Sequence, residues 1–310
     1  MKIVFAGSSE FAIPALESII SSKAHSLALV ISQPPRPKGR NKKLQDTALA
    51  ARALDYSLEL FCPEDINSAE SVERIMAHKA DILITASYGA FVGKSLRRGF
   101  PMKAVNLHPS LLPKYRGSSP IRAALLSGDS VTGVSIFRLT AKMDAGDILM
   151  QEQLEILPNE NYSGLHDRLA NLAAKMLISY LDDPDMVKPI PQDHAQATFT
   201  KKVQKSDLIL DFNISAKALQ NQIRAYSLEP GAFTYFRGQP LKILEAELVP
   251  DKLSYPPGVI FEIIKNQGFI VSTSDGALLV RKVQPAGKKI MDAWAYHLGA
   301  RLEAGQRFTE

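Results

Sequence analysis

The sequence of 310 residues holds one cysteine, Cys62, and one tryptophan. A single cysteine excludes an internal disulfide bond and any metal site built from several cysteines. Long apolar runs are also missing: segments such as DILITASYGAFV at 81–92 fall well short of the roughly 20 residues that a membrane-spanning helix requires. The N-terminus, MKIVFAGSSEF, lacks the long apolar region of a signal peptide. We therefore expect a cytoplasmic protein that makes no membrane contact.

Several motifs of known chemistry are absent as well. The first apolar segment ends in FAGSSEFA, whose one glycine is too few for the dinucleotide-binding pattern G-x-G-x-x-G. The sequence contains no G-x-S-x-G motif, which would mark a nucleophilic serine. Its 6 histidines are scattered, with no H-x-H or H-x-x-x-H pair, so we expect no bound metal.

A modest excess of positive charge is present. Lysine and arginine total 37 against 32 acidic residues, which gives a formal net charge of +5. Such a charge fits a polyanionic partner such as a nucleic acid, but by itself it does not identify one.

The first half of the chain alternates between two hydrophobic patterns. Leucine, alanine and isoleucine recur at helical spacing in several segments, and short apolar runs that predict buried strands lie between them. The predicted strands are 2–6, 27–31, 81–86 and 103–107, and the predicted helices are 10–22, 46–55, 68–78 and 161–182. Strands that alternate with helices predict an α/β domain with a mainly parallel sheet, which we assign to residues 1–188.

The second half changes character. Residues 189–205 are rich in proline and polar residues with little periodicity, and we interpret them as a linker. In residues 206–310 one helical pattern, SAKALQNQIRAY, precedes a series of short apolar runs. These runs lie near 232–237, 240–248, 258–264, 267–273 and 277–284. Short strands at close spacing predict a smaller β-barrel domain, with an OB-like barrel as one candidate.

Polar residues follow the strand predicted at 103–107, in NLHPSLLPKYRGSSPI at 106–121. Ligands of open parallel sheets bind beyond the carboxyl ends of the strands, so Asn106 and His108 are expected beside a cleft. Downstream, Asp144 lies in an Asp-x-Gly turn between two strand-like runs. An amide, an imidazole and a carboxylate suit transfer of a carbonyl group to an amine. The structural alternatives are a turn-forming Asn, a strand-end His and an Asp that caps its own turn.

The segment 106–121, followed by TGVSIFRLTAKMDAGDIL at 132–149, resembles the formyltransferase family that uses 10-formyltetrahydrofolate. The resemblance implies a Rossmann-like domain in which Asn106, His108 and Asp144 are the catalytic set. It also implies 10-formyltetrahydrofolate as formyl donor and co-substrate. The residues expected to bind this donor are Ser110, Leu111, Leu112 and Pro113, with Tyr88 and Gly89 at the neighbouring strand end.

Each member of the catalytic set receives a role from this chemistry. Asn106 and His108 would stabilise the oxyanion of the tetrahedral intermediate, and His108 would also protonate the leaving nitrogen N10. Asp144 would orient His108 and assist removal of a proton from the amine, directly or through water. The sequence leaves the choice between these duties of Asp144 open.

A dense cluster of positive charge lies in QPPRPKGRNKKL at 33–44. Composition alone allows a solvated surface loop, and contacts of lysine and arginine to phosphates are the functional alternative. The loop resembles that of family members that formylate methionyl-tRNA, and the similarity continues through ATFTKKVQKSD at 197–207 toward the C-terminus. This resemblance implies initiator methionyl-tRNA as partner, held by the C-terminal domain and by the loop cations Arg36, Lys38, Arg40, Lys42 and Lys43.

Two alternatives to this function stay open. A related enzyme could formylate an amino sugar or a ribonucleotide amine, and a module without activity could merely bind RNA. The basic loop argues against the first alternative, and the intact catalytic set argues against the second. Pro35 stands where the family commonly has Asp, and Glu229 stands where Trp is usual, which leaves the loop geometry and the packing near Glu229 open. No obligate protein partner is indicated.

Overall fold

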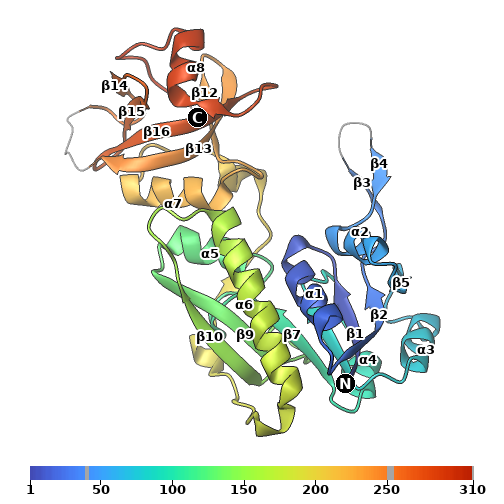
Figure 1. Ribbon diagram of the computed structural model, residues 1–310. Coiled ribbons are helices and arrows are strands. Elements are labelled where there is room, and N and C mark those ends of the chain that lie inside the picture. Colours follow the sequence, from blue (N-terminus) through green and yellow to red (C-terminus); the bar gives the residue numbers. More distant parts are fainter. Residues whose placement is uncertain (39–41, 250–254, 309–310) are drawn as a thin grey trace. The chain divides into compact units, whose positions relative to one another are not determined.

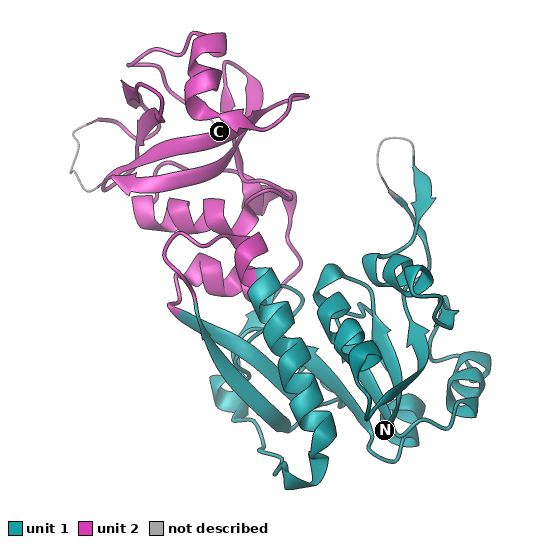
Figure 2. Ribbon diagram, in the orientation of Figure 1, with its two compact units in different colours: residues 1–120, 131–155, 166–200 teal, residues 121–130, 156–165, 201–310 magenta. Residues whose placement is uncertain are grey.

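The computed structural model describes residues 1–38, 42–249 and 255–308. The chain divides into two compact units, each assembled from several stretches of sequence (Figure 2). Unit 1 comprises residues 1–120, 131–155 and 166–200. Unit 2 comprises residues 121–130, 156–165 and 201–310. The three candidate catalytic residues therefore all lie in unit 1.

Unit 1 is built on a seven-stranded sheet with the order β10-β9-β7-β6-β1-β2-β5 (Figure 1). The strands from β7 to β5 are parallel, and β9 and β10 are antiparallel additions at one edge. Parallel strands are buried on both faces, which is why runs such as KIVFAG and ILITA are apolar almost throughout. The bounds are β1 Lys2–Gly7, β2 Ser26–Ile31, β5 Leu60–Phe61, β6 Ile82–Ala86, β7 Ala104–His108, β9 Val131–Arg138 and β10 Ile148–Glu155.

Helices of unit 1 bury apolar residues against this sheet. Ile75 of α3 and Leu96 of α4 share one buried cluster with Val4 and Leu83 of the strands. Helix α2 begins after Thr47, whose hydroxyl caps its first turn. The helical bounds up to residue 200 are η1 Glu10–Ala12, α1 Ile13–Ser21, α2 Ala48–Asp55, α3 Ala69–Ala77, α4 Lys94–Gly99, α5 Pro120–Ser127, α6 Tyr162–Asp182, η2 Pro184–Met186 and η3 His194–Gln196.

Two small ladders complete unit 1. The first joins β3, Arg36–Lys38, to the antiparallel β4, Lys43–Gln45. The second joins β8, Arg116–Gly117, to the parallel β11, Phe199–Thr200. The second ladder places residues 199–200, within the segment 189–205, beside residues 116–117, which follow β7 in the sequence. The domain limits at 188 and 206 stay a prediction.

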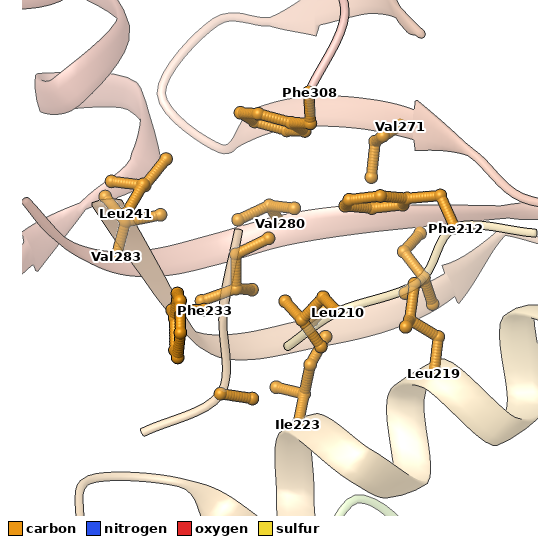
Figure 3. Close-up of a cluster of buried hydrophobic side chains, with 14 of the residues drawn as sticks. Leu210, Phe212, Leu219, Ile223, Phe233, Leu241, Val271, Val280, Val283 and Phe308 are labelled. Atoms are coloured by element: carbon orange, nitrogen blue, oxygen red, sulfur yellow. The ribbon is translucent and has the colours of Figure 1, made fainter. Parts of the chain in front are cut away.

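Unit 2 contains an antiparallel sheet with the order β12-β13-β16-β15-β14, and β17 pairs with β16. Its core is a buried cluster formed by strands, by α7 and by the C-terminal segment (Figure 3). Within this cluster the rings of Phe212 and Phe308 stack with centroids 5.6 Å apart. The bounds are η4 Lys205–Leu208, α7 Ala216–Tyr226, β12 Phe233–Phe236, β13 Gln239–Val249, β14 Ile260–Ile264, β15 Gly268–Ser272, β16 Ala277–Pro285, β17 Met291–Asp292 and α8 Ala293–Ala300.

The predicted fold class is confirmed: a mainly parallel α/β sheet is followed by a smaller antiparallel β unit. In the described part of unit 2 no ladder joins β12 to β14, which fits a partly open, OB-like barrel. The strands predicted near the start, at 2–6, 27–31, 81–86 and 103–107, are β1, β2, β6 and β7, and each bound differs by at most one residue. None of the described helices has the length and apolarity that crossing a membrane needs.

Candidate active site

Asn106 lies on β7, between Thr85 of β6 and Phe137 of β9. The hydroxyl of Thr85 donates to Oδ1 of Asn106 at 2.7 Å, which orients the amide. Because Oδ1 is held in this way, the amide presents its Nδ2 hydrogens on the other side. Within the described ranges no residue accepts a hydrogen bond from Nδ2. Asn106 therefore offers a half-buried, uncommitted pair of donors.

His108 follows two residues later on β7 and faces the same side of the sheet. Its side chain is buried, with the edge of the Phe137 ring against it at a centroid distance of 6.3 Å. Nε2 lies 2.9 Å from the carbonyl oxygen of Tyr115. A carbonyl only accepts, so Nε2 carries the hydrogen and Nδ1 of the neutral ring is an acceptor. Burial lowers the pKa of His108, although Asp144 and the Tyr115 carbonyl act in the opposite direction.

Asp144 comes from the turn between β9 and β10 and has a positive φ of 47°, a conformation that Asp tolerates better than most residues. Its Oδ2 accepts a hydrogen bond from the backbone N–H of Gly117 at 2.7 Å. Gly117 itself has a φ of 110°, and a Cβ there would lie 2.5 Å from the carbonyl oxygen of Thr200. Only glycine lets β8 approach β11 closely at this point and still deliver its N–H to the carboxylate.

The carboxylate of Asp144 and the ring of His108 face each other at a distance of 3.9 Å between Oδ2 and Nδ1. Both atoms are acceptors while His108 is neutral, which agrees with a separation too long for a hydrogen bond. A proton on Nδ1 would convert the pair into an ion pair. The arrangement can thus accept a proton and stabilise the charge that results.

The segment Ser110–Pro113 is held by its own hydrogen bonds. The buried hydroxyl of Ser110 donates to the carbonyl of Lys114 at 2.7 Å. The hydroxyl of Ser135 donates to the carbonyl of Ser110 at 2.6 Å and accepts the N–H of Leu112 at 3.1 Å. Ser110 and the buried Leu112 therefore fix the turn, and the half-buried Leu111 and Pro113 are the side chains that a ligand can reach.

Tyr88 and Gly89, expected as a wall of the donor pocket, differ in accessibility. The Tyr88 side chain belongs to a buried apolar cluster, and burial raises its pKa to about 12, with smaller contributions from Cys62 and Asp65. Gly89 has a φ of 84°, and no atom lies within 4 Å of the position that a Cβ would take. Open space therefore adjoins the Gly89 backbone, whereas the Tyr88 ring is turned into the core.

The basic loop forms the hairpin of β3 and β4. Arg36, Lys42 and Lys43 are exposed, and Arg36 donates to the carboxylate of Glu64 at 2.8 Å. Lys38 lies in β3 opposite Lys43, and Arg40 lies outside the described residues. In the part of the loop that is described, no cation contacts the three candidate catalytic residues.

Sequence reasoning missed several groups that hold the site. Thr85 and Gly117 bind Asn106 and Asp144 directly. The Gly in the segment YRGSS was a visible signal, because a turn glycine near a polar strand end marks close backbone approach. Arg116 and Gln192 are also part of the surroundings and are separated by 76 positions, so no local pattern relates them. Among the described residues, no cluster of three or more His, Cys, Asp and Glu is placed to hold a metal ion.

Comparisons with known proteins relate both halves of the chain to formyltransferases. The family model described as formyl transferase matches residues 1–181, and the model described as formyl transferase, C-terminal domain, matches residues 202–301. A methionyl-tRNA formyltransferase from Sulfurihydrogenibium sp. (strain YO3AOP1) is 37% identical over 99% of this chain and 100% of the relative. One from Thermotoga maritima is 36% identical over 99% of this chain and 98% of the relative.

Solved structures share the fold at lower identity. An N-formyltransferase from Helicobacter canadensis superposes with a TM-score of 0.66 at 18% identity, over 92% of this chain and 99% of that one. A methionyl-tRNA formyltransferase from Clostridium thermocellum gives a TM-score of 0.58 at 16% identity, over 92% of this chain and 98% of that one. At such identities these structures show the fold alone.

Proposed function

The chain belongs to the methionyl-tRNA formyltransferase family, and we propose that it transfers the formyl group of 10-formyltetrahydrofolate to the α-amino group of initiator methionyl-tRNA. The product is formylmethionyl-tRNA, with which translation starts. One observation carries the proposal: an uncommitted amide donor, a neutral imidazole nitrogen and a carboxylate gather at the end of β7, in Asn106, His108 and Asp144.

The nucleophile in this reaction is the α-amine of the methionyl ester. A free terminal amine has a pKa of about 7.7–8.0, so a neutral fraction is present near pH 7. The amine attacks the formyl carbon, and negative charge develops on the formyl oxygen. The Nδ2 hydrogens of Asn106 are available to donate to that oxygen, and one such donor typically contributes about 10²–10³ in turnover.

Proton transfer runs through Nδ1 of His108, because Nε2 is bonded to the carbonyl of Tyr115. Attack leaves a positive charge on the amine nitrogen, which gives its proton to Nδ1 directly or by way of Asp144. The imidazolium lies 3.9 Å from Oδ2 of Asp144, which stabilises it. His108 then gives the proton to N10 as the bond between N10 and the formyl carbon breaks. His108 can donate toward the oxyanion only after this first transfer.

The formyl donor is assigned to the space beside the turn Ser110–Pro113. Leu111 and Pro113 supply accessible apolar surface, and the backbone at Gly89 borders open space. Ser110 and Leu112 hold the turn from the buried side, and the ring of Tyr88, which is next to Gly89 in the sequence, lies in a separate buried cluster. 10-Formyltetrahydrofolate acts here as a co-substrate, and the chemistry above needs no metal.

The tRNA is assigned to the basic loop and to unit 2. Exposed cations at Arg36, Lys42 and Lys43 suit phosphate contacts, which supply affinity without reading bases. Lys38 and Arg40 belong to the same group of proposed tRNA-binding cations because of their positions in the sequence of the loop. A small amine substrate, such as an amino sugar, gives this loop no phosphate backbone to bind. The cytoplasm, as the place where translation uses the product, stays the predicted location.

A direct test supplies purified protein with 10-formyltetrahydrofolate and one of three acceptors. These are methionyl-tRNA, free methionine and a nucleotide-linked amino sugar, and formyl incorporation is measured for each. We expect a kcat/KM for methionyl-tRNA that exceeds the other two by orders of magnitude. Preferred formylation of the amino sugar would replace the proposal with the small-molecule alternative, and failure with every acceptor would favour an RNA-binding module.

A further inference from the structure

Gln192 is a buried residue that the chemistry above does not use. It lies between α6 and η3, and its side chain has both of its polar ends occupied. Nε2 donates to the carbonyl oxygens of Asp144 at 2.9 Å and of Gly146 at 2.7 Å. Oε1 accepts two hydrogen bonds from Arg116, at 2.6 Å from Nη2 and at 3.1 Å from Nε. A single amide thus connects the turn that carries Asp144 to the strand β8.

Arg116 is the second unusual member of this group, because its residue is only 4% exposed. Within the described ranges no carboxylate pairs with its guanidinium, whose further contacts are Nδ1 of His194 at 2.9 Å and the face of the Phe199 ring. A buried cation held by neutral acceptors polarises them. Here it withdraws electron density from the Gln192 amide and strengthens the hydrogen bonds that the amide donates to the Asp144 turn.

The two attachments of Asp144 converge on neighbouring residues. The backbone of Asp144 is held by Gln192, which is bonded to Arg116, and the carboxylate of Asp144 is held by the N–H of Gly117. The positive φ of Asp144 is a conformation that needs such support. Residues far apart in sequence therefore determine where the carboxylate lies relative to His108.

We propose that Gln192, bonded to the buried Arg116, is a positioning residue that holds the Asp144 turn at the distance from His108 that proton transfer requires. This inference rests on the proposed function for the role of the pair. Hydrogen-bonding partners that orient the ligands of a metal site typically contribute about 10- to 100-fold in activity, and we expect a loss of the same order here. The loss should fall on kcat, because Gln192 contacts neither proposed substrate site.

The test uses Gln192→Met, which keeps the length of the side chain and removes its amide. We expect kcat to fall about 10- to 100-fold, with the KM values for methionyl-tRNA and for the folate within about twofold of wild type. Gln196→Ala is the matched control, because Gln196 is an exposed glutamine of the same segment that bonds to Asp193. This control should leave kcat unchanged. Gln192→Glu is the second variant, since it keeps an acceptor for Arg116 and still lacks the donors.

A second readout does not depend on activity. Nitrogen-15 NMR titration of the His108 ring reports the position of Asp144, which is the charged group facing that ring beside the neutral Tyr115 carbonyl and Phe137. Displacement of the carboxylate in Gln192→Met should lower the pKa of His108 further. A folded variant with unchanged kcat and an unchanged His108 titration would overturn the inference. Absence of formylation by the wild-type protein would instead overturn the proposed function and leave the NMR result standing.

Discussion

Two regions of unit 1 that the sequence marked as functional are built in opposite ways. His108 at the end of β7 is 4% exposed and is fixed by a backbone carbonyl and by a ring edge. In the basic hairpin, the side chain of Arg36 is 66% exposed, and it pairs with Glu64, which lies outside the hairpin and is 73% exposed. Reacting atoms need groups that are fixed in advance where water is scarce, whereas phosphates are attracted over a distance by exposed, solvated charge. Substitutions in the first region should reduce rate, and those in the second should reduce affinity.

The largest effects are expected at the end of β7. Asn106→Ala and His108→Ala should each lose at least about 10²–10³ in kcat, since each removes a group that acts in the transition state. Asp144→Asn should lose a comparable factor, because an amide cannot take a proton. Single-turnover formylation of methionyl-tRNA, with folding checked by circular dichroism, measures these losses.

The matched control for this set is Asn171→Ala, which truncates an exposed asparagine whose side chain donates to the Asp167 carbonyl on α6. It should keep the wild-type kcat. Near-normal turnover in a folded Asn106, His108 or Asp144 variant would remove that residue from the catalytic set. The contrast between the two regions would then lose its basis.

A smaller effect concerns pH, because burial lowers the pKa of His108 below its ordinary value of about 6.5. The unfolded chain then takes up a proton at higher pH than the folded protein. The free energy of unfolding should therefore fall as pH drops below about 6.5, down to the lowered pKa of the folded state. Proton acceptance by Nδ1, and with it kcat, should persist to pH values below 6.5 for the same reason.

Urea denaturation at about pH 7.5 and about pH 5.5 gives the loss of unfolding free energy on acidification. The contribution of His108 is the difference in this loss between wild type and His108→Gln. The variant should lose less stability on acidification, since it lacks the group that must stay neutral. An equal loss in both proteins would show that His108 is not held neutral by burial.

Smaller still is the effect expected in the basic hairpin. Arg40→Ala should raise the KM for methionyl-tRNA several-fold and reduce the slope of log affinity against log salt by about 0.7–0.9, the value for one phosphate contact. The KM for the folate should not change, because the loop need not touch the donor. Lys175→Ala removes an equal charge from the exposed face of α6 and serves as control. Unaltered tRNA kinetics in Arg40→Ala would leave the hairpin as a solvated surface turn.

The part of the structure that the sequence could predict is the part that leaves a local pattern in the sequence. Continuous apolar runs identified β1, β2, β6 and β7, because buried parallel strands leave a strong pattern in the sequence. The polar residues Asn106 and His108 stood out by following such a run. Strand β5, of 2 residues, is too short to leave a pattern.

The supporting groups were not predictable from local sequence. Gln192 reaches Arg116 across 76 positions, and Gly117 gains its role only from pairing with β11. The choice of His108 Nδ1 as the proton-accepting atom depends on the Tyr115 carbonyl, which is a backbone group and has no sequence signature. Long-range hydrogen bonds of this kind appear only once the chain is folded.

The smallest expected effect tests whether the hairpin cation Arg36, which pairs with Glu64, is available to bind tRNA phosphates. Glu64→Gln removes the charge that pairs with Arg36 at 2.8 Å, and a pair this exposed adds little to stability. The thermal midpoint should therefore stay within about a degree or two of wild type, since roughly 0.2–1 kcal/mol is the usual range for an exposed pair.

Release of Arg36 should slightly lower the KM for methionyl-tRNA, most clearly at low salt, where phosphate contacts count most. Fluorescence-monitored melting and initial rates at two salt concentrations provide the measurements. A raised KM would mean that the ion pair orders the hairpin for binding, and the difference between a buried catalytic site and an exposed binding loop would be smaller than the exposures indicate.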